Sequence, residues 1–203
     1  MKTIQPLENG KKYHIYNRGI NNDVLFKENS NYEYFLKLYD KHIDPIAETY
    51  AWCLMKNHFH FLVYIKLESE IDFQKLEYST IDKPKKLSIS KQFSNLFSSY
   101  TLSINKKYNR TGSLFEKNFE RKCINHQKYL LNLIHYINYN PVLHRIVKNP
   151  LEYPWSSYIG TISEKPTKIQ REKIISIFGS KENFINSHNK DFSYEYIQHF
   201  LID

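Results

Sequence analysis

The chain has 203 residues, 41% of them hydrophobic, which suits one domain of ordinary size with an appended segment. Lysine and arginine number 29 against 21 acidic residues, and the net charge of +8 favours polyanionic partners such as nucleic acid. The 17 tyrosines and 13 phenylalanines suit stacking on unpaired bases, although an AT-rich coding sequence would yield the same bias.

The cysteines and the apolar segments indicate the cellular compartment in which the protein is expected. Cys53 and Cys123 show no metal-like spacing, which predicts a reduced cytoplasmic protein rather than a disulfide framework. We recognise no signal peptide and no apolar run of membrane-spanning length, so no membrane association is expected.

The first part of the chain predicts three strands and a helix. Residues 11–19 alternate apolar and polar side chains, which is typical of a strand, and the strand is expected to turn at its final glycine. A helix is expected from residue 30 or 31 to about residue 42. Residues 48–55 predict a second strand, and the two residues after it predict a tight antiparallel hairpin into a third strand over 58–66.

The third predicted strand carries two histidines. Side chains alternate between the faces of a strand, so His58 and His60 should share one face and reach a single metal ion. The opposite face is apolar and is expected to point into the core: Phe59, Phe61, Val63 and Ile65. The plainer interpretation is two half-exposed histidines on a sheet surface. His14 should lie on a neighbouring strand, where a structural role is favoured.

The middle of the chain predicts another helix and a basic strand. A charged connection over 67–85 precedes an amphipathic helix over 87–109, and residues 113–124 predict a hairpin or strand. Its basic side chains could line a phosphate track or form a solvated strand edge: Lys117, Arg121 and Lys122. The order of elements predicts an α+β fold, a ferredoxin-like βαββαβ antiparallel sheet with helices on one face. The other face should then stay free for the histidines.

Residues 126–142 predict a further helix that ends at Pro141. Its apolar stripe contains Leu130, Leu133, Ile134 and Ile137. Tyr136 and Asn140 are four residues apart and should project side by side next to this stripe.

This pairing has a chemical use. A phenol can attack a phosphodiester, but its pKa of about 10 keeps it protonated, so the phosphate must be made a better electrophile. A divalent ion held by two imidazole nitrogens and one amide oxygen would do so. Mg²⁺ or Mn²⁺ suits this role, although such a site could also hold Zn²⁺ or Ni²⁺. The plainer interpretation is a tyrosine that packs in the core, and Tyr139 is a rival nucleophile.

Several motifs resemble one family. NHFHFLV, residues 57–63, resembles the HUH motif of histidine, hydrophobic residue and histidine, and HYINYNPV, residues 135–142, resembles the tyrosine helix of single-tyrosine HUH transposases. The match is most similar to the REP-associated tyrosine transposases, a group in which Asn stands where insertion-sequence members more often have Gln. Three further segments support it over about residues 11–160: YHIYNRG, GSLFEKNFERK and YPWSSY.

The resemblance implies a site and an activity. Tyr136 would be the nucleophile, with His58, His60 and Asn140 as ligands of Mg²⁺ or Mn²⁺. The protein would cleave and rejoin single-stranded DNA next to a hairpin through a covalent 5′-phosphotyrosine, as a monomer or homodimer and with no nucleotide cofactor. Candidate contacts to the DNA backbone are Arg18, Lys56, Lys117, Arg121 and Lys122.

The sequence is also compatible with a second function, and it predicts two parts of the chain. The alternative function is a non-catalytic ferredoxin-like protein that binds DNA or RNA hairpins, in which the histidines are incidental. The domain organisation expected is a nuclease domain over 1–160 and a helical extension over 161–203. Its two helices are expected over 169–178 and 192–201, and the extension could read the hairpin, support a dimer or cover the sheet.

Overall fold

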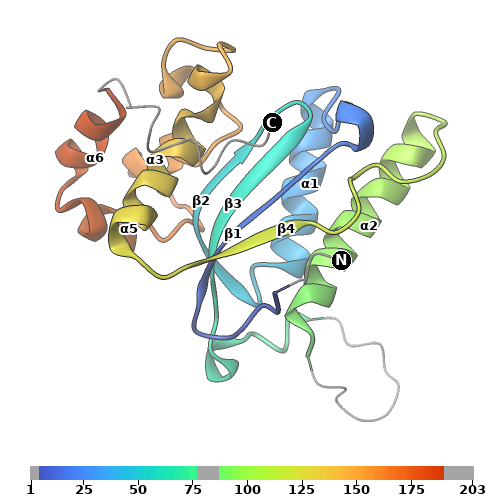
Figure 1. Cartoon of the computed structure of the whole chain (residues 1–203), viewed down its shortest axis with the longest axis horizontal. Coiled ribbons are helices and arrows are strands. Elements are labelled where there is room, and N and C mark those ends of the chain that lie inside the picture. The colour runs from blue at the N-terminus through green and yellow to red at the C-terminus, as the bar shows by residue number, and fades with distance from the viewer. Residues whose placement is uncertain (1–4, 77–86, 190–203) are drawn as a thin grey trace.

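The computed structural model describes residues 5–76 and 87–189, and within them a four-stranded antiparallel sheet forms the centre of the fold (Figure 1). Its strands are β1 (Lys12–Arg18), β2 (Ala47–Leu54), β3 (His58–Ile65) and β4 (Glu120–Ile124), in the order β2-β3-β1-β4. This order and the intervening helices confirm the predicted α+β, ferredoxin-like arrangement. The fourth strand is shorter than the predicted segment 113–124.

Two long helices cover one face of the sheet, α1 (Asn29–His42) and α2 (Ile89–Lys107) (Figure 1). Ser88 begins α2 by accepting a hydrogen bond from the backbone N–H of Lys91. The core beneath these helices contains Phe59 and Phe61 of β3, as the strand alternation predicts. The described loops contain three single-turn 3-10 helices: Ile20–Asn22, Glu68–Glu70 and Pro150–Glu152.

The second face of the sheet is not free, which corrects the sequence-based expectation. Helix α3 (Gln127–Leu143) packs on β2 and β3, on the side opposite α1 and α2 (Figure 1). Its apolar stripe forms a second core with Ala51 and Leu62 of the sheet. Strands β2 and β3 carry apolar side chains on both faces of the sheet. Burial of the second face under α3 removes its apolar side chains from water.

Pro141 does not end α3, which corrects a second expectation. The helix continues to Leu143, because a proline here removes only one N–H donor near the end of the helix. The chain leaves the helix at Arg145, which has a left-handed φ of 56°. The N–H of Arg145 bonds the carbonyl of Val142, and the N–H of Ile146 bonds that of Pro141. This is the Schellman pattern, with an arginine where glycine is usual.

The described part of the C-terminal region, up to residue 189, adds three short helices: α4 (Tyr158–Ile162), α5 (Arg171–Phe178) and α6 (Lys181–His188). Helix α5 matches the helix expected over 169–178. Helix α6 lies in a segment that we expected to be a connection, and Ser180 caps it by accepting from the N–H of Asn183. The helix expected over 192–201 lies outside the described residues.

These C-terminal helices contribute to the second core. Ile174 of α5 and Phe184 of α6 are fully buried in it, and α6 contacts α3. Among the three roles considered for the extension, covering the sheet and α3 is therefore one that it performs. The domain boundary at residue 160 stays a prediction.

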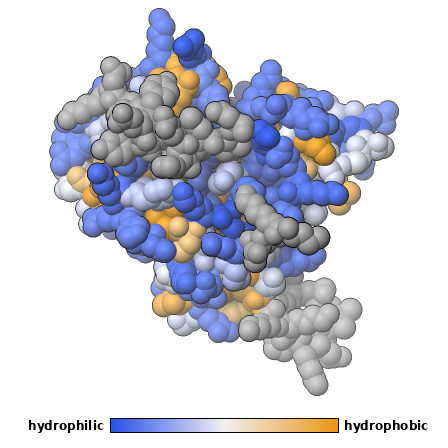
Figure 2. All heavy atoms as spheres, in the orientation of Figure 1, coloured by the Kyte–Doolittle hydropathy of each residue, from blue (hydrophilic) through white to orange (hydrophobic). Residues whose placement is uncertain are grey.

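The surface agrees with the basic, polar composition. Figure 2 shows a face that is largely hydrophilic, with scattered apolar side chains. Within residues 5–76 and 87–189, no helix is both long and apolar enough to cross a membrane. Cys53 and Cys123 are not joined by a disulfide.

Candidate active site

His58 stands at the first position of β3 and points toward α3. Its Nε2 lies 3.2 Å from Oδ1 of Asn140, and its Nδ1 lies 2.9 Å from Oδ1 of Asn57. The side chain is 9% exposed, whereas Asn140 is fully buried. The strand and the helix therefore bring together two of the predicted metal ligands.

His60 lies two residues further along the same face and is completely buried. Its Nδ1 is 3.0 Å from Nε2 of His14 on β1. Its Nε2 is buried and has no hydrogen-bond partner among the described residues. A buried polar atom without a partner is costly, so this nitrogen marks a place where the isolated chain is incomplete.

Tyr136 lies on α3 one turn before Asn140. Its ring meets the ring of His60 edge-on, with the centroids 5.2 Å apart, and the residue is only 2% exposed. The rival Tyr139 is half-buried with its ring 5.1 Å from that of His135, which stacks on His188 of α6. The helix thus turns Tyr136, rather than Tyr139, toward the paired histidines.

The side chains gathered here include donor atoms of the kinds that bind a divalent cation. Two imidazole nitrogens and an amide oxygen converge here, and the unpartnered Nε2 of His60 offers a lone pair in one of its tautomers. Among the described residues, no group of three or more His, Cys, Asp or Glu side chains is arranged to hold an ion. A cation at this place would therefore depend on the Asn140 oxygen and on oxygens supplied by substrate or water.

Burial keeps the imidazoles of the site neutral. Desolvation lowers the pKa of His58 to about 4, with further lowering by the charges of His144 and Arg18. Desolvation also holds the pKa of His60 well below its ordinary value. At neutral pH each ring therefore keeps one nitrogen lone pair, which is the state that a metal ion requires.

The buried histidines also predict how stability depends on pH. Burial lowers the folded-state pKa of His188 and His58 to about 4 and of His14 and His135 to about 3, against 6.5 in the unfolded chain. The unfolded chain therefore binds more protons, and the stability present above pH 6.5 is lost as the pH falls toward these values. Each histidine contributes at most about 1.4 kcal/mol per pH unit.

Urea unfolding at pH 7 and at pH 5 checks this expectation. The free energy of unfolding should be several kcal/mol lower at pH 5, since these four histidines and His60 act in the same direction. A His188→Gln variant should show a shallower dependence, because it removes one of the four. Equal stability of the wild-type protein at the two pH values would contradict the burial argument.

Two of the predicted DNA contacts lie near the histidines. Arg18 pairs with His58 in the register of β1 and β3, and its Nε lies 2.7 Å from Oε1 of Glu116. Lys56 is exposed in the hairpin turn that precedes His58. Both cations therefore lie at the end of the sheet that carries the candidate site, although Arg18 already has an acidic partner.

The other three basic residues do not form one track, which corrects that part of the prediction. Arg121 packs over the ring of Phe119 and donates from Nη1 to Ser90 of α2 at 2.8 Å, so it faces the first helical layer. Lys122 pairs with His14 in the register and lies over the ring of Tyr129, on the α3 side. Lys117 is exposed in the loop before β4. Successive side chains of β4 point to opposite faces of the sheet, so Arg121 and Lys122 lie on different faces.

Two histidines near the site lacked a decisive sequence signal. His14 bonds His60, and the exposed ring of His144 lies 5.2 Å from that of His58. His144 follows Asn140 by four residues, at the C-cap position of the same helix, and this spacing was the available sign. The position of His14 on β1 indicated that it could lie near the site. Its contact with His60 depends on the register between β1 and β3, which the local sequence does not specify.

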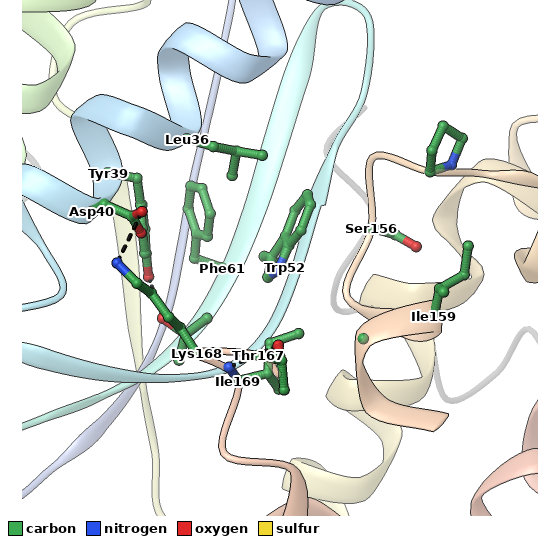
Figure 3. Close-up of a pocket in the computed structure, with 13 residues that line it drawn as sticks. Leu36, Tyr39, Asp40, Trp52, Phe61, Ser156, Ile159, Thr167, Lys168 and Ile169 are labelled. Atoms are coloured by element: carbon green, nitrogen blue, oxygen red, sulfur yellow. Dashed lines mark hydrogen bonds and ion pairs between the residues drawn. The ribbon is translucent and has the colours of Figure 1, made fainter. Parts of the chain in front are cut away.

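A separate pocket of about 490 Å³ lies on the other side of the sheet (Figure 3). Trp52, Phe61 and Tyr39 form much of its wall, and Lys168 and Asp40 make an ion pair of 2.9 Å beside it. Phe61 belongs to the core that faces α1, so the pocket and the candidate site are on opposite faces of the sheet.

Fold and site together define an α+β protein in which paired histidines of an antiparallel sheet face a tyrosine-bearing helix. No protein-family model and no curated protein sequence matches the chain. The chain is similar to the solved structure of a REP-associated tyrosine transposase bound to a REP hairpin, with a TM-score of 0.59 and 17% identity, covering 82% of this chain and 89% of that one. It therefore has the fold of a REP-associated tyrosine transposase, as its motifs predicted.

Two further solved structures are of bacterial tRNA(His) guanylyltransferase-like proteins. The complex with GTP gives a TM-score of 0.38 at 12% identity, covering 71% of this chain and 72% of that one. The complex with ATP gives a TM-score of 0.39 at 12% identity, covering 73% of this chain and 67% of that one. These scores are too low to carry an argument about function.

Proposed function

We propose that the protein is a transposase-type nuclease that cleaves and rejoins single-stranded DNA beside a hairpin, through a covalent 5′-phosphotyrosine on Tyr136. His58, His60 and Asn140 would hold the divalent ion, Mg²⁺ or Mn²⁺. The observation that carries the proposal is the convergence of these four side chains between β3 and α3, including the 3.2 Å approach of His58 to Asn140. The transposase fold and the hairpin bound to the structural neighbour support it.

Tyr136 would make and break the bonds at phosphorus. Its Oη attacks the scissile phosphate, a bond from phosphorus to Oη forms, and the bond from phosphorus to the 3′ oxygen breaks. The phenol proton is lost and the 3′ oxygen gains a proton, which leaves a free 3′-OH and a 5′-phosphotyrosine. Attack by a 3′-OH on this linkage runs the same steps backward and rejoins the strand without a nucleotide cofactor.

The remaining residues would position the phosphate. When bound, the divalent ion polarises the phosphate and stabilises the departing oxygen. His58 and Asn140 would fix the position of the ion, because their side chains project from a packed strand and a packed helix. Arg18 and Lys56 would hold the DNA backbone at the mouth of the site, and exposed Lys117 and Lys122 would contact it further away. Arg121, which packs against α2, is the weakest of the five candidates.

The alternative function, hairpin binding without cleavage, has one observation in its favour. Tyr136 is 2% exposed, and a nucleophile must reach its substrate. Strand cleavage would require α3 to shift or the side chain to rotate on DNA binding. A binding protein would need no such change.

Adduct formation separates the two functions. The protein is incubated with labelled single-stranded hairpin DNA that carries unpaired flanks, with Mg²⁺, Mn²⁺ or EDTA, and resolved on a denaturing gel. We expect a labelled protein band that requires metal and is absent with EDTA. If the protein binds the hairpin in a mobility-shift assay but forms no adduct with either metal, the nuclease proposal is rejected and the non-catalytic binding function is supported. Hairpins from the DNA that flanks the gene are the first substrates to use.

A further inference from the structure

His14 is a buried histidine on β1. It is 1% exposed, and its Nε2 lies 3.0 Å from Nδ1 of His60. The two rings are nearly parallel, with centroids 5.1 Å apart. Tyr16 lies beside both rings, with its ring centroid 4.6 Å from that of His14 and 6.0 Å from that of His60. The contact is therefore held by the β1–β3 pairing, which places His14 opposite Leu62 and Tyr16 opposite His60.

Two ring nitrogens at this distance share one proton, so one donates and the other accepts. If His14 donates, His60 must carry its own proton on Nε2, and that proton lies buried with no acceptor among the described residues. If His60 donates from Nδ1, its Nε2 carries no proton and keeps a lone pair, in a ring whose centroid lies 5.2 Å from that of His58. Only the second arrangement leaves His60 able to bind a cation.

We propose that His14 is a positioning residue that accepts the Nδ1 proton of His60 and thereby fixes the Nε2 of His60 as the metal-binding atom. This role rests on the proposed function, since it has a purpose only if a cation binds His58, His60 and Asn140. Metal-ligating histidines commonly use their second nitrogen in this way, and loss of the outer partner typically weakens metal binding by about 10- to 100-fold.

The role differs from simple packing in what can replace the side chain. Gln and Met have unbranched side chains of the same length, but only Gln offers an oxygen that accepts from His60 Nδ1. His14→Gln should therefore keep the tautomer of His60, whereas His14→Met should lose the acceptor at closely similar volume. A packing role would make the two variants alike.

The first test measures Mn²⁺ binding by electron paramagnetic resonance, without DNA and without turnover. We expect the dissociation constant of His14→Gln to stay within about threefold of the wild-type value and that of His14→Met to rise by about 10- to 100-fold. His188→Gln is the matched control, because it alters a histidine of equal burial whose Nδ1 bonds the carbonyl of Phe184. Its Mn²⁺ affinity should equal that of the wild-type protein.

The second test needs no variant and covers the case in which His14→Met does not fold. Long-range proton–nitrogen NMR correlations of the wild-type protein report which ring nitrogen carries the proton. We expect His60 to be protonated on Nδ1 and bare on Nε2. A His60 protonated on Nε2 would overturn the proposal, and so would equal Mn²⁺ affinity in His14→Met and wild-type protein.

The Mn²⁺ measurements also distinguish failure of the His14 role from failure of the proposed metal site. Equal affinity in the variants together with strong wild-type Mn²⁺ binding removes the role of His14 and leaves the proposed nuclease intact. Failure of the wild-type protein to bind Mn²⁺ overturns the metal site itself, and the role of His14 falls with it.

Discussion

Tyr136→Phe should abolish the covalent protein–DNA adduct while leaving the fold intact. The variant removes only the phenolic oxygen, which is the atom that would bond to phosphorus, so the loss should be at least about 1,000-fold in adduct yield. The ring itself packs beside His60 in the second core and is retained. The denaturing gel measures the adduct, and thermal unfolding should show a midpoint within a few degrees of the wild-type value.

Tyr139→Phe is the matched control for this result. The two tyrosines lie on the same helix, but Tyr139 points toward His135 and the α6 side. Its adduct yield should stay close to the wild-type value. An adduct that survives in Tyr136→Phe and disappears in Tyr139→Phe would move the nucleophile and contradict the proposed geometry. DNA affinity measured in EDTA should be unchanged in both variants.

Asn140→Leu should lower metal-dependent adduct formation by at least about 100-fold, because it removes the only oxygen donor of the proposed ligand set. Asn140→Asp keeps an oxygen at the same place and adds a charge that attracts a cation, so its activity should stay within about tenfold. Mn²⁺ titration of adduct formation measures both variants. The Asp variant should reach half of its maximal activity at a lower Mn²⁺ concentration than the Leu variant.

The stability of these variants distinguishes a ligand from a packing residue. Asn140 is fully buried, and its Nδ2 has no hydrogen-bond partner within the part of the chain that the structure describes. Replacement by Leu removes that unpaired donor but deprives His58 Nε2 of its 3.2 Å contact. We therefore expect little net change in unfolding free energy. A large loss of stability with normal adduct formation would assign Asn140 to the core and contradict a metal role.

The sequence by itself predicted the first three strands and their faces, and it proposed the four residues of the candidate site. Alternation over residues 58–66 is a local pattern, and it was enough to put His58 and His60 on one face and the phenylalanines on the other. The i, i+4 spacing of Tyr136 and Asn140 likewise follows from helix geometry alone. These features depend on neighbours in the chain, so sequence reasoning could reach them.

Only the tertiary structure decided what covers the histidine face and which residues pair across it. Helix α3 lies on β2 and β3 because their second face is apolar at Ala51 and Leu62, and that burial also encloses Tyr136. The contact of His14 with His60 follows from strand register, and the separation of Arg121 from Lys122 follows from which layer each face of β4 meets. Long-range packing sets these contacts, and no local pattern encodes it.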